Sequence, residues 1–341
     1  MKSNNAETVY IVGAGFSAGL GYPLTANLLV DAWPRLSTKY QDRLEKIIKF
    51  HHQRFDPTRN TTFPYIEELL TEINVNLDMF GSSRPIEGVF TKATLEDVQA
   101  ELLTQIAHWF HTLYKKADGI DWLTKVTARI RDERATVISF NWDLVLDQRL
   151  FGETITAADY GLTDSHSGPL LLKPHGSLNW YEGDQIKPIN AVKKVKIYEA
   201  ENTFRPVWAF LPPRGIKSAS ERRYTPLIVP PTYIKDFRRP ISGKLWQKCT
   251  TALSVAKEII VLGYSLPAAD LQAKFILRCG FHNQTEGTIL SKDRRSKPTG
   301  AARVTVVNPD SSSARRIEAV VGSSTEFEWK AMKVEDWAAT M

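Results

Sequence analysis

A short apolar strand that runs directly into a glycine-rich turn is the feature that most constrains the fold of this chain. Residues Thr8 to Val12 (TVYIV) have the β-branched and aromatic composition of a buried strand. The segment Gly13 to Gly19 (GAGFSAG) follows without a break, and a helical segment comes next. This strand–turn–helix order predicts the first unit of an α/β sheet.

Strand and helix patterns alternate through much of the remaining chain. Thr136 to Phe140 has the pattern of a second strand, and it leads into a helical pattern that contains Leu144, Leu146 and Leu150. Further along we expect a helix from Ser242 to about Ala256, a strand from Ile259 to Leu262, a helix from Ala268 to Arg278, a strand from Arg303 to Val307, and a helix from Ser311 to Val321 that Gly322 stops. This alternation favours an α/β fold with a Rossmann-like, doubly wound, mostly parallel sheet.

A helical module is expected between the first two strands. From Leu24 to about Leu113 the patterns are mostly helical, and one helix face carries Leu102, Ile106, Trp109, Phe110 and Leu113. We therefore expect a single domain over residues 1–341, with a Rossmann core at about 8–34 and 134–330 and an inserted helical module at about 35–133. Loops and short strands are expected from about Phe151 to Pro240, and a mobile surface loop from Thr285 to Thr299.

The charge of the chain is mildly basic and dispersed. The net charge of +6 is spread over the chain apart from two short basic runs, which contain Lys193, Lys194 and Lys196, and Lys292, Arg294, Arg295 and Lys297. No aromatic residues interleave with these runs as a base-stacking platform requires. We interpret the runs as solvated loops, and direct nucleic-acid binding is not expected.

Cysteine content and hydropathy indicate the compartment. Cys249 and Cys279 are the only cysteines, and they are too few and too far apart for a zinc or redox signature or a disulfide framework. The N-terminus is polar, and no apolar stretch approaches the roughly 18 residues of a membrane span. We expect a cytoplasmic protein in a reducing environment, with no membrane partner.

The glycine-rich turn is a candidate phosphate-binding site. Glycines between a strand and a helix let backbone N–H groups approach a diphosphate, which a helix N-terminus also favours. The alternative is a turn that only reverses the chain. A dinucleotide oxidoreductase would show a second strand soon afterwards, ending in an acidic residue. In this chain Leu24 to Trp33 has a helical pattern that includes Asp31, which weakens the dehydrogenase interpretation.

Polar residues follow the second strand in the segment Phe140-Asn141-Trp142-Asp143. In open α/β sheets, ligands bind beyond the carboxyl ends of the strands. The amide of Asn141 and the carboxylate of Asp143 are therefore candidates to reach a bound substrate. The alternative is that either residue only caps the helix that follows.

A histidine lies in the turn-rich segment Lys173 to Trp180 (KPHGSLNW). A single histidine is usually structural or solvated. His175, however, is held between a proline and a glycine after an apolar run, and imidazole is the side chain best suited to move a proton near neutral pH. The position favours a functional role.

Two more turns follow predicted strands. Leu262 to Leu266 (LGYSL) presents Gly263 and Ser265, and Val307 to Asp310 (VNPD) presents Asn308. Each places small or polar groups at the carboxyl end of a strand. An equal interpretation of Asp310 is that it only caps the next helix.

Together, the five motifs resemble those of the sirtuin family. GAGFS is similar to the GAGxS loop of sirtuins and FNWD to their QNID segment, while the HG pair at His175, the GYSL turn and the VNP turn follow in sirtuin order. The segments GAGFSAGLGYPLT, KPHGSLNW and GYSLPAAD resemble the bacterial SIR2-like proteins of antiphage defence. The resemblance covers most of the chain in scattered blocks, and excludes most of the stretch from about 35 to 130.

The resemblance implies an enzyme with NAD as substrate, an NAD+ glycohydrolase that releases nicotinamide and ADP-ribose and depletes NAD in abortive infection. It implies that Asn141 orients water or the ribose hydroxyls, that His175 is the general base and that Asp143 holds the ribose. The implied dinucleotide site comprises Gly13, Ala14, Gly15, Phe16 and Ser17 at the diphosphate, Gly263 and Ser265 at the phosphate and ribose, and Asn308 at the adenosine ribose.

Two departures from the deacylating sirtuins bear on the activity. Those enzymes carry two CxxC pairs that bind structural zinc, whereas two isolated cysteines cannot complete a four-ligand site. Neither a zinc module nor another metal is expected. Deacylating sirtuins also follow the glycine loop with a proline–acid–Phe–Arg segment, where this chain has Tyr22-Pro23-Leu24-Thr25. Peptide deacylation is therefore disfavoured.

Three alternatives to hydrolysis stay open, namely a regulatory subunit that senses NAD or ADP-ribose without turnover, a sirtuin-type deacylase and an ADP-ribosyltransferase. Because uncontrolled cleavage of a shared cofactor harms its host, we expect regulation. The expected means are self-assembly into a homo-oligomer or an activating or inhibiting partner protein.

Overall fold

The structure of the chain is a computed structural model. The structure describes residues 7–80, 91–114, 119–163, 168–182, 196–198, 204–211, 226–229, 240–291, 294–322 and 325–341. Lys193, Lys194 and Lys292 of the basic runs lie outside these residues.

A six-stranded parallel sheet forms the centre of the molecule, with the order β10-β9-β6-β1-β2-β3. Its strands are β1 (Thr8–Val12), β2 (Thr136–Ser139), β3 (Leu170–Leu172), β6 (Glu258–Leu262), β9 (Arg303–Val307) and β10 (Phe327–Lys330). The chain winds outward from β1 to β3 on one side and from β6 to β10 on the other. This is the doubly wound arrangement expected from the sequence, and its topological switch lies between β1 and β6.

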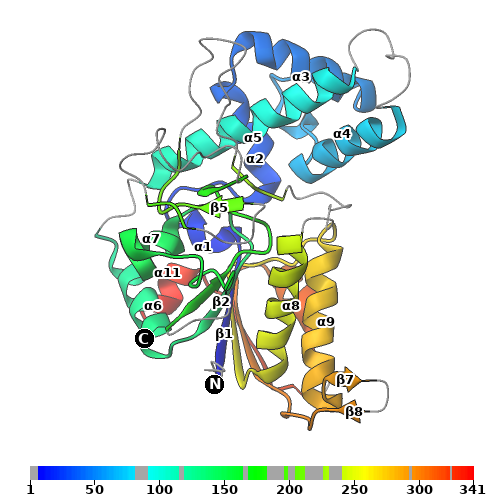
Figure 1. The fold of residues 1–341 in the computed structure, drawn as a ribbon. Coiled ribbons are helices and arrows are strands. Elements are labelled where there is room, and N and C mark those ends of the chain that lie inside the picture. Colours follow the sequence, from blue (N-terminus) through cyan, green and yellow to red (C-terminus); the bar gives the residue numbers. More distant parts are fainter. Residues whose placement is uncertain are drawn as a thin grey trace.

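The central strands are apolar because helices cover both faces of the sheet. Positions 9–12 of β1, all of β2 and positions 259–262 of β6 are buried. Figure 1 shows α6 (Asp121–Asp132) and α7 (Val145–Phe151) on one side of the sheet, and α8 (Pro240–Val255) and α9 (Leu271–Glu286) on the other. Two further helices, α10 (Ser311–Glu318) and α11 (Val334–Ala338), come near the end of the chain. The helix α11 packs on α6.

A second group of helices lies above the sheet in Figure 1. It comprises α2 (Leu28–Ala32), α3 (Thr38–His51), α4 (Ile66–Phe80) and α5 (Lys92–Tyr114), and α5 packs against the other three. The predicted apolar face of α5 is confirmed, because Leu102, Ile106, Trp109, Phe110 and Leu113 are all buried. The division into a core and an insertion at about 35–133 stays a prediction; within that range, α6 packs with α7 and α11 beside the sheet.

The first turn after β1 forms the short helix α1 (Ala14–Ala18). The 3-10 helices are Thr25–Asn27, Trp33–Arg35, Asn60–Thr62 and Gly152–Thr154. β4 (Trp180–Glu182) and β5 (Phe204–Pro206) form an antiparallel pair, in the region where loops and short strands were expected. None of the helices in the described part of the chain is both long and apolar enough to cross a membrane.

The prediction of a loop from Thr285 to Thr299 was wrong. The helix α9 continues to Glu286, and β7 (Ile289–Ser291) pairs with β8 (Arg294–Arg295) in an antiparallel hairpin. Gly287 ends the helix with φ +74°, and the Ser296 N–H donates to Thr288 O at 2.9 Å. These local backbone bonds order a segment whose polar composition is typical of a loop.

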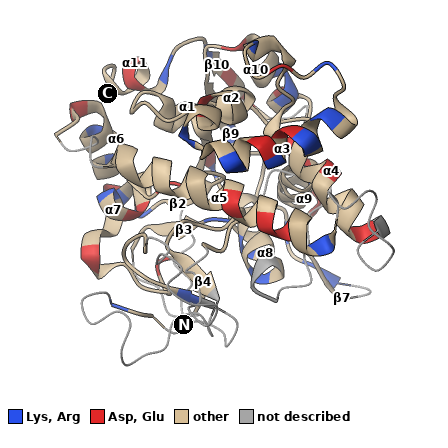
Figure 2. Cartoon of the chain, turned by 90° about the horizontal axis from the view of Figure 1, so that it is seen from above, with Lys and Arg blue, Asp and Glu red and all other residues tan. Residues whose placement is uncertain are grey.

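Figure 2 shows basic and acidic residues interspersed over the upper side of the molecule.

Candidate active site

A cavity opens at the carboxyl end of the sheet, next to the turns that follow β1 and β6. It encloses about 830 Å³ of empty space, its open mouth included. Turns that follow the strands contribute Gly13, Ala14, Ser17, Phe140, Asn141, Trp142, Asp143, His175, Tyr264, Ser265, Pro267, Ala269 and Asp270. The upper helices and the segment before them contribute Tyr22, Pro23, Thr25, Leu28, Glu67 and Phe110. Ligands in doubly wound folds bind at this switch point.

The glycines of the first turn allow two turns to touch. The Gly15 N–H donates to Gly263 O at 2.8 Å, and the Gly13 N–H donates to Leu262 O at 3.1 Å. A Cβ atom on Gly15 would lie 2.8 Å from the Cα of Gly263, and one on Gly13 would lie 2.6 Å from the Cα of Tyr264. The N–H groups of Gly13 and Gly15 are thus engaged within the protein, and Gly13, Ala14 and Ser17 are the residues of this turn that reach the cavity.

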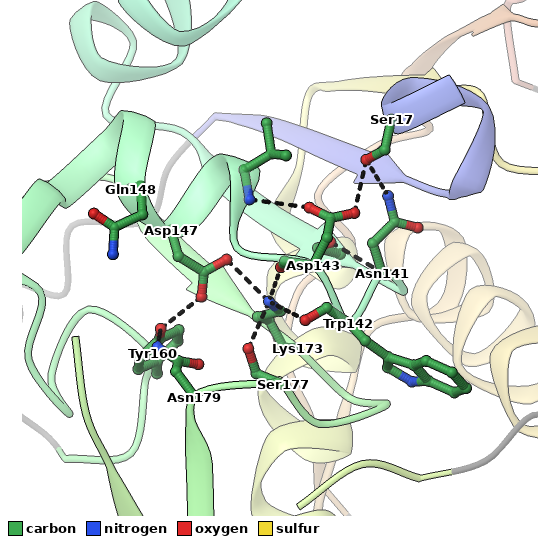
Figure 3. A network of polar contacts seen from close by, with 12 residues as sticks. Ser17, Asn141, Trp142, Asp143, Asp147, Gln148, Tyr160, Lys173, Ser177 and Asn179 are labelled. Atoms are coloured by element: carbon green, nitrogen blue, oxygen red, sulfur yellow. Dashed lines mark hydrogen bonds and ion pairs between the residues drawn. The ribbon is translucent and has the colours of Figure 1, made fainter. Parts of the chain in front are cut away.

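Ser17, Asn141 and Asp143 form one hydrogen-bonded cluster (Figure 3). The Ser17 hydroxyl donates to Asp143 Oδ2 at 2.7 Å, and Asn141 Nδ2 donates to Ser17 Oγ at 3.2 Å. Asn141 Nδ2 also donates to Gly13 O at 2.9 Å. The amide and the carboxylate that follow β2 are therefore held against the turn that follows β1.

The Asp143 carboxylate has a perturbed environment. Burial raises the pKa of Asp143 above its ordinary value of 3.8, while the Lys173 charge and the Ser17 hydrogen bond act in the opposite direction. The other oxygen, Oδ1, accepts the Val145 N–H at 3.0 Å, at the start of α7. Asp143 thus lines the cavity and also binds the first turn of the following helix.

A buried ammonium group ties the turn after β2 to the turn after β3 (Figure 3). Lys173 Nζ lies 2.9 Å from Asp147 Oδ2, and both side chains are only 1% exposed. The same ammonium donates to Asp143 O at 2.6 Å and to Ser177 Oγ at 2.7 Å, while the Tyr160 hydroxyl donates to Asp147 Oδ1. This network positions the backbone beneath the candidate catalytic residues.

His175 lies in the cavity wall among aromatic rings. Its ring centroid is 4.9 Å from that of Phe140 and 5.9 Å from that of Trp246. Gly176, with φ +78°, makes the turn that follows it. His175 Nε2 lies 3.3 Å from Asp270 Oδ2. The imidazole therefore lines the cavity between aromatic rings and next to a carboxylate.

The remaining predicted residues lie around this centre. Gly263 has φ +61° and touches the first turn, and Ser265 lines the cavity. Asn308 is buried and its Nδ2 donates to Tyr264 O at 3.4 Å, so that it joins two turns. The Phe16 ring packs edge-on against Trp122 at 5.4 Å, within the core. Gly15, Phe16, Gly263 and Asn308 are not among the residues that line the cavity.

Sequence reasoning assigned no role to Asp270, Glu67, Lys173 or the Tyr264 hydroxyl. Asp270 was detectable only as a cap, because an aspartate stands at the start of a predicted helix. Both aspartates do act as caps, since Asp270 accepts the Ala273 N–H at the start of α9, and Asp310 accepts the Ser312 and Ser313 N–H groups at the start of α10. No local signal identifies Glu67, which reaches the cavity from α4.

Among the described residues, one group has metal-ligand geometry, and it lies outside the cavity. Ligand atoms of His52, Glu68 and Glu72 lie within 4.8 Å of one another near α3 and α4. The two cysteines are free thiols, and burial raises the pKa of both Cys249 and Cys279.

The strand order and the cavity at its switch point define a Rossmann-like α/β protein. Its structure is similar to that of a mutant Sir2 homologue in complex with 2′-O-acetyl ADP-ribose, with 12% identity, a TM-score of 0.44 and coverage of 99% of this chain and 92% of that chain. It is also similar to a Sir2 homologue in complex with NAD, with 13% identity, a TM-score of 0.43 and coverage of 98% and 86%. No protein-family model matches the sequence, and no curated protein sequence does. The fold class therefore rests on the strand order and pairing.

Proposed function

We propose that this protein is an NAD+ glycohydrolase that cleaves NAD+ to nicotinamide and ADP-ribose. The observation that carries the proposal is the convergence of Asn141, Asp143 and His175 on one cavity at the switch point of the sheet. These are the three residues to which the sirtuin resemblance assigns the reacting ribose. A dinucleotide suits the position, because the turns after β1 and β6 meet there.

The charge of the cavity supports a cationic ring as the part of the substrate that enters it. Glu67, Asp143 and Asp270 line it, and the described lining residues include neither Lys nor Arg. The nicotinamide ring of NAD+ is a pyridinium, and its departure leaves positive charge on the ribose. Carboxylates placed before the reaction begins stabilise such charge in the transition state more than they would in water.

The proposed reaction breaks the bond between nicotinamide N1 and ribose C1′. The bonding electrons leave with nicotinamide, which becomes neutral. A water oxygen then bonds to C1′, and the proton that it loses passes to His175 as general base. The products are nicotinamide, ADP-ribose and one proton. Asn141 orients the water or the ribose hydroxyls, and Asp143 holds the ribose and stabilises its charge.

The test is product formation by purified protein incubated with NAD+. Wild type should release nicotinamide and free ADP-ribose in equal amounts, and His175→Ala and Asn141→Ala should each reduce the rate on the order of 10²-fold or more. His282→Ala, on the exposed side of α9, is the matched control and should retain the wild-type rate. Binding of NAD+ without turnover, also with candidate activators, would instead favour the sensing function.

Free ADP-ribose also separates hydrolysis from transfer. Both reactions break the same bond and differ only in the acceptor that attacks C1′. ADP-ribose found on protein or another acceptor, in place of the free product, would reassign the enzyme as an ADP-ribosyltransferase.

The biological role we propose is depletion of NAD in the cytoplasm during antiphage defence, under control of self-assembly or a partner protein. It rests on the motif resemblance and on the harm that unregulated NAD cleavage would cause. Cells that express wild type should lose NAD on phage infection and yield fewer plaques, and cells with His175→Ala should do neither. Equal plaque numbers would remove the defence role and leave the enzymatic proposal standing.

A further inference from the structure

We propose that Asp270 is a positioning residue for His175, and that the two form a buried carboxylate–imidazole pair that sets the basicity of the histidine. Asp270 Oδ2 lies 3.3 Å from His175 Nε2, with side-chain exposures of 7% and 8%. Both residues line the cavity. The kinetic consequence rests on the proposed function, whereas the pairing itself does not.

The Asp270 carboxylate has a fixed orientation. Asp270 stands at the N-cap of α9, where its Oδ1 accepts the Ala273 N–H at 3.3 Å. The Tyr264 hydroxyl donates to Oδ2 at 2.9 Å, the oxygen that also faces the histidine. One oxygen therefore serves the helix and the other faces the site.

Aromatic packing fixes the other side of the pair. Phe140 stacks on Tyr264 with ring centroids 4.4 Å apart and planes at 11°, and its ring meets His175 edge-on. Tyr264 thus packs on the ring that contacts His175 and also binds the carboxylate that faces His175. Phe140 and Trp246 restrict the rotation of the imidazole, and Tyr264 joins this packing to the Asp270 carboxylate.

The chemical consequence follows from the two ring nitrogens. A neutral imidazole carries one N–H, and the hydrogen-bond partner of that nitrogen selects the tautomer. With Nε2 facing Asp270, the carboxylate favours the tautomer that carries its proton on Nε2. The carboxylate then stabilises the imidazolium that forms. The other ionisable residues of the cavity are Asp143, Glu67, Tyr22 and Tyr264.

The test is a proton NMR titration of the His175 ring, assigned with His175→Ala, in the full-length protein. Asp270→Asn retains an N-cap side chain but removes the charge. We expect the pKa of His175 to fall by at least about one unit, since an opposite charge at this distance shifts a pKa by about 1–3 units. Asp310→Asn, the matched change at the N-cap of α10, should leave that pKa unchanged.

A second variant gives an effect of opposite sign. Tyr264→Phe keeps the ring stack but removes the donor to Asp270 Oδ2, so that the carboxylate interacts more strongly with the imidazole. The pKa of His175 should then rise. Loss of packing alone does not predict shifts of opposite sign in the two variants. An unchanged His175 pKa in both folded variants would overturn the proposal.

Kinetics separate this inference from the proposed function. In Asp270→Asn we expect kcat to fall about 10–100-fold with KM within about 3-fold, because proton transfer is affected more than binding. If wild type cleaves no NAD+ but the titrations shift as predicted, the pair stands and the proposed activity fails. If wild type cleaves NAD+ but the titrations do not shift, the proposed activity stands and the pairing of Asp270 with His175 fails.

Discussion

The hydroxyl of Ser17 donates a 2.7 Å hydrogen bond to Asp143 Oδ2 across the boundary between the first two strand units. Ser17 follows β1 and Asp143 follows β2, and the two strands are adjacent in the sheet. The contact brings a residue of the glycine-rich turn to the carboxylate proposed to hold the ribose. Because the Ser17 hydroxyl donates to this carboxylate, the contact depends on the protonation state of Asp143.

Asp143→Asn should abolish most turnover without lowering stability at neutral pH. Burial raises the pKa of Asp143 above 3.8 in the folded protein. An ionised carboxylate with a raised pKa costs folding free energy, and this cost disappears as the pH falls below the unfolded-state pKa. The variant should therefore be at least as stable as wild type near neutral pH, by a margin that shrinks towards pH 3.8. Urea unfolding across this range measures the margin, and a margin that grew on acidification would contradict the argument.

Lys173→Met should destabilise the protein by about 3–5 kcal/mol, because it leaves the buried Asp147 carboxylate without its cation. Chemical denaturation measures the loss. The matched control is Lys257→Met, which breaks the exposed ion pair with Glu7 and should change stability little. Equal effects of the two substitutions would show that the buried ion pair of Lys173 does not stabilise the fold.

Gly263→Ala should disrupt the contact between the turns after β1 and β6. Its φ of +61° is strained for alanine, and the new Cβ would lie 2.3 Å from Phe16 N. We expect a loss of about 2–4 kcal/mol in unfolding free energy and loss of NAD binding. Gly243→Ala, in α8, meets no atom within 4 Å and should stabilise the protein by about 0.5–1 kcal/mol. Calorimetric unfolding measures the stability of both variants, and calorimetric titration measures their binding of NAD. A Gly263→Ala variant that is as stable as wild type and binds NAD would refute the steric argument.

Glu67→Gln should weaken the preference of the cavity for a cationic ring. Removing one of the carboxylates that line it should raise KM for NAD+ about 5-fold, or roughly 1 kcal/mol, which is the Coulomb energy of two unit charges about 4 Å apart in bulk water. The inhibition constant of NADH, whose nicotinamide ring is neutral, should stay the same. Glu68→Gln, at the exposed neighbouring position of α4, is the control. A parallel change for NAD+ and NADH would indicate a steric effect.

Much of the architecture was predictable from local patterns. Thr8–Val12 and Arg303–Val307 form strands with the predicted bounds, and the face of α5 is buried as its spacing indicates. Sequence reasoning failed for strands whose side chains are largely exposed. The strand β10 was missed because Phe327–Lys330 is partly exposed at the sheet edge, and the hairpin near Ile289 was taken for a loop because its residues are exposed.

The sequence by itself determined which segments become the buried strands β1, β2, β6 and β9, which turns follow them, and which turns carry an amide, an acid and an imidazole, because these properties depend on neighbouring residues. Only the tertiary structure decided that Asp270 faces His175, that Lys173 pairs with Asp147 and that Gly15 touches Gly263. Each of these contacts joins turns from different strands. Which turns meet depends on the order of the strands in the sheet, and that order is set by the packing of the whole chain.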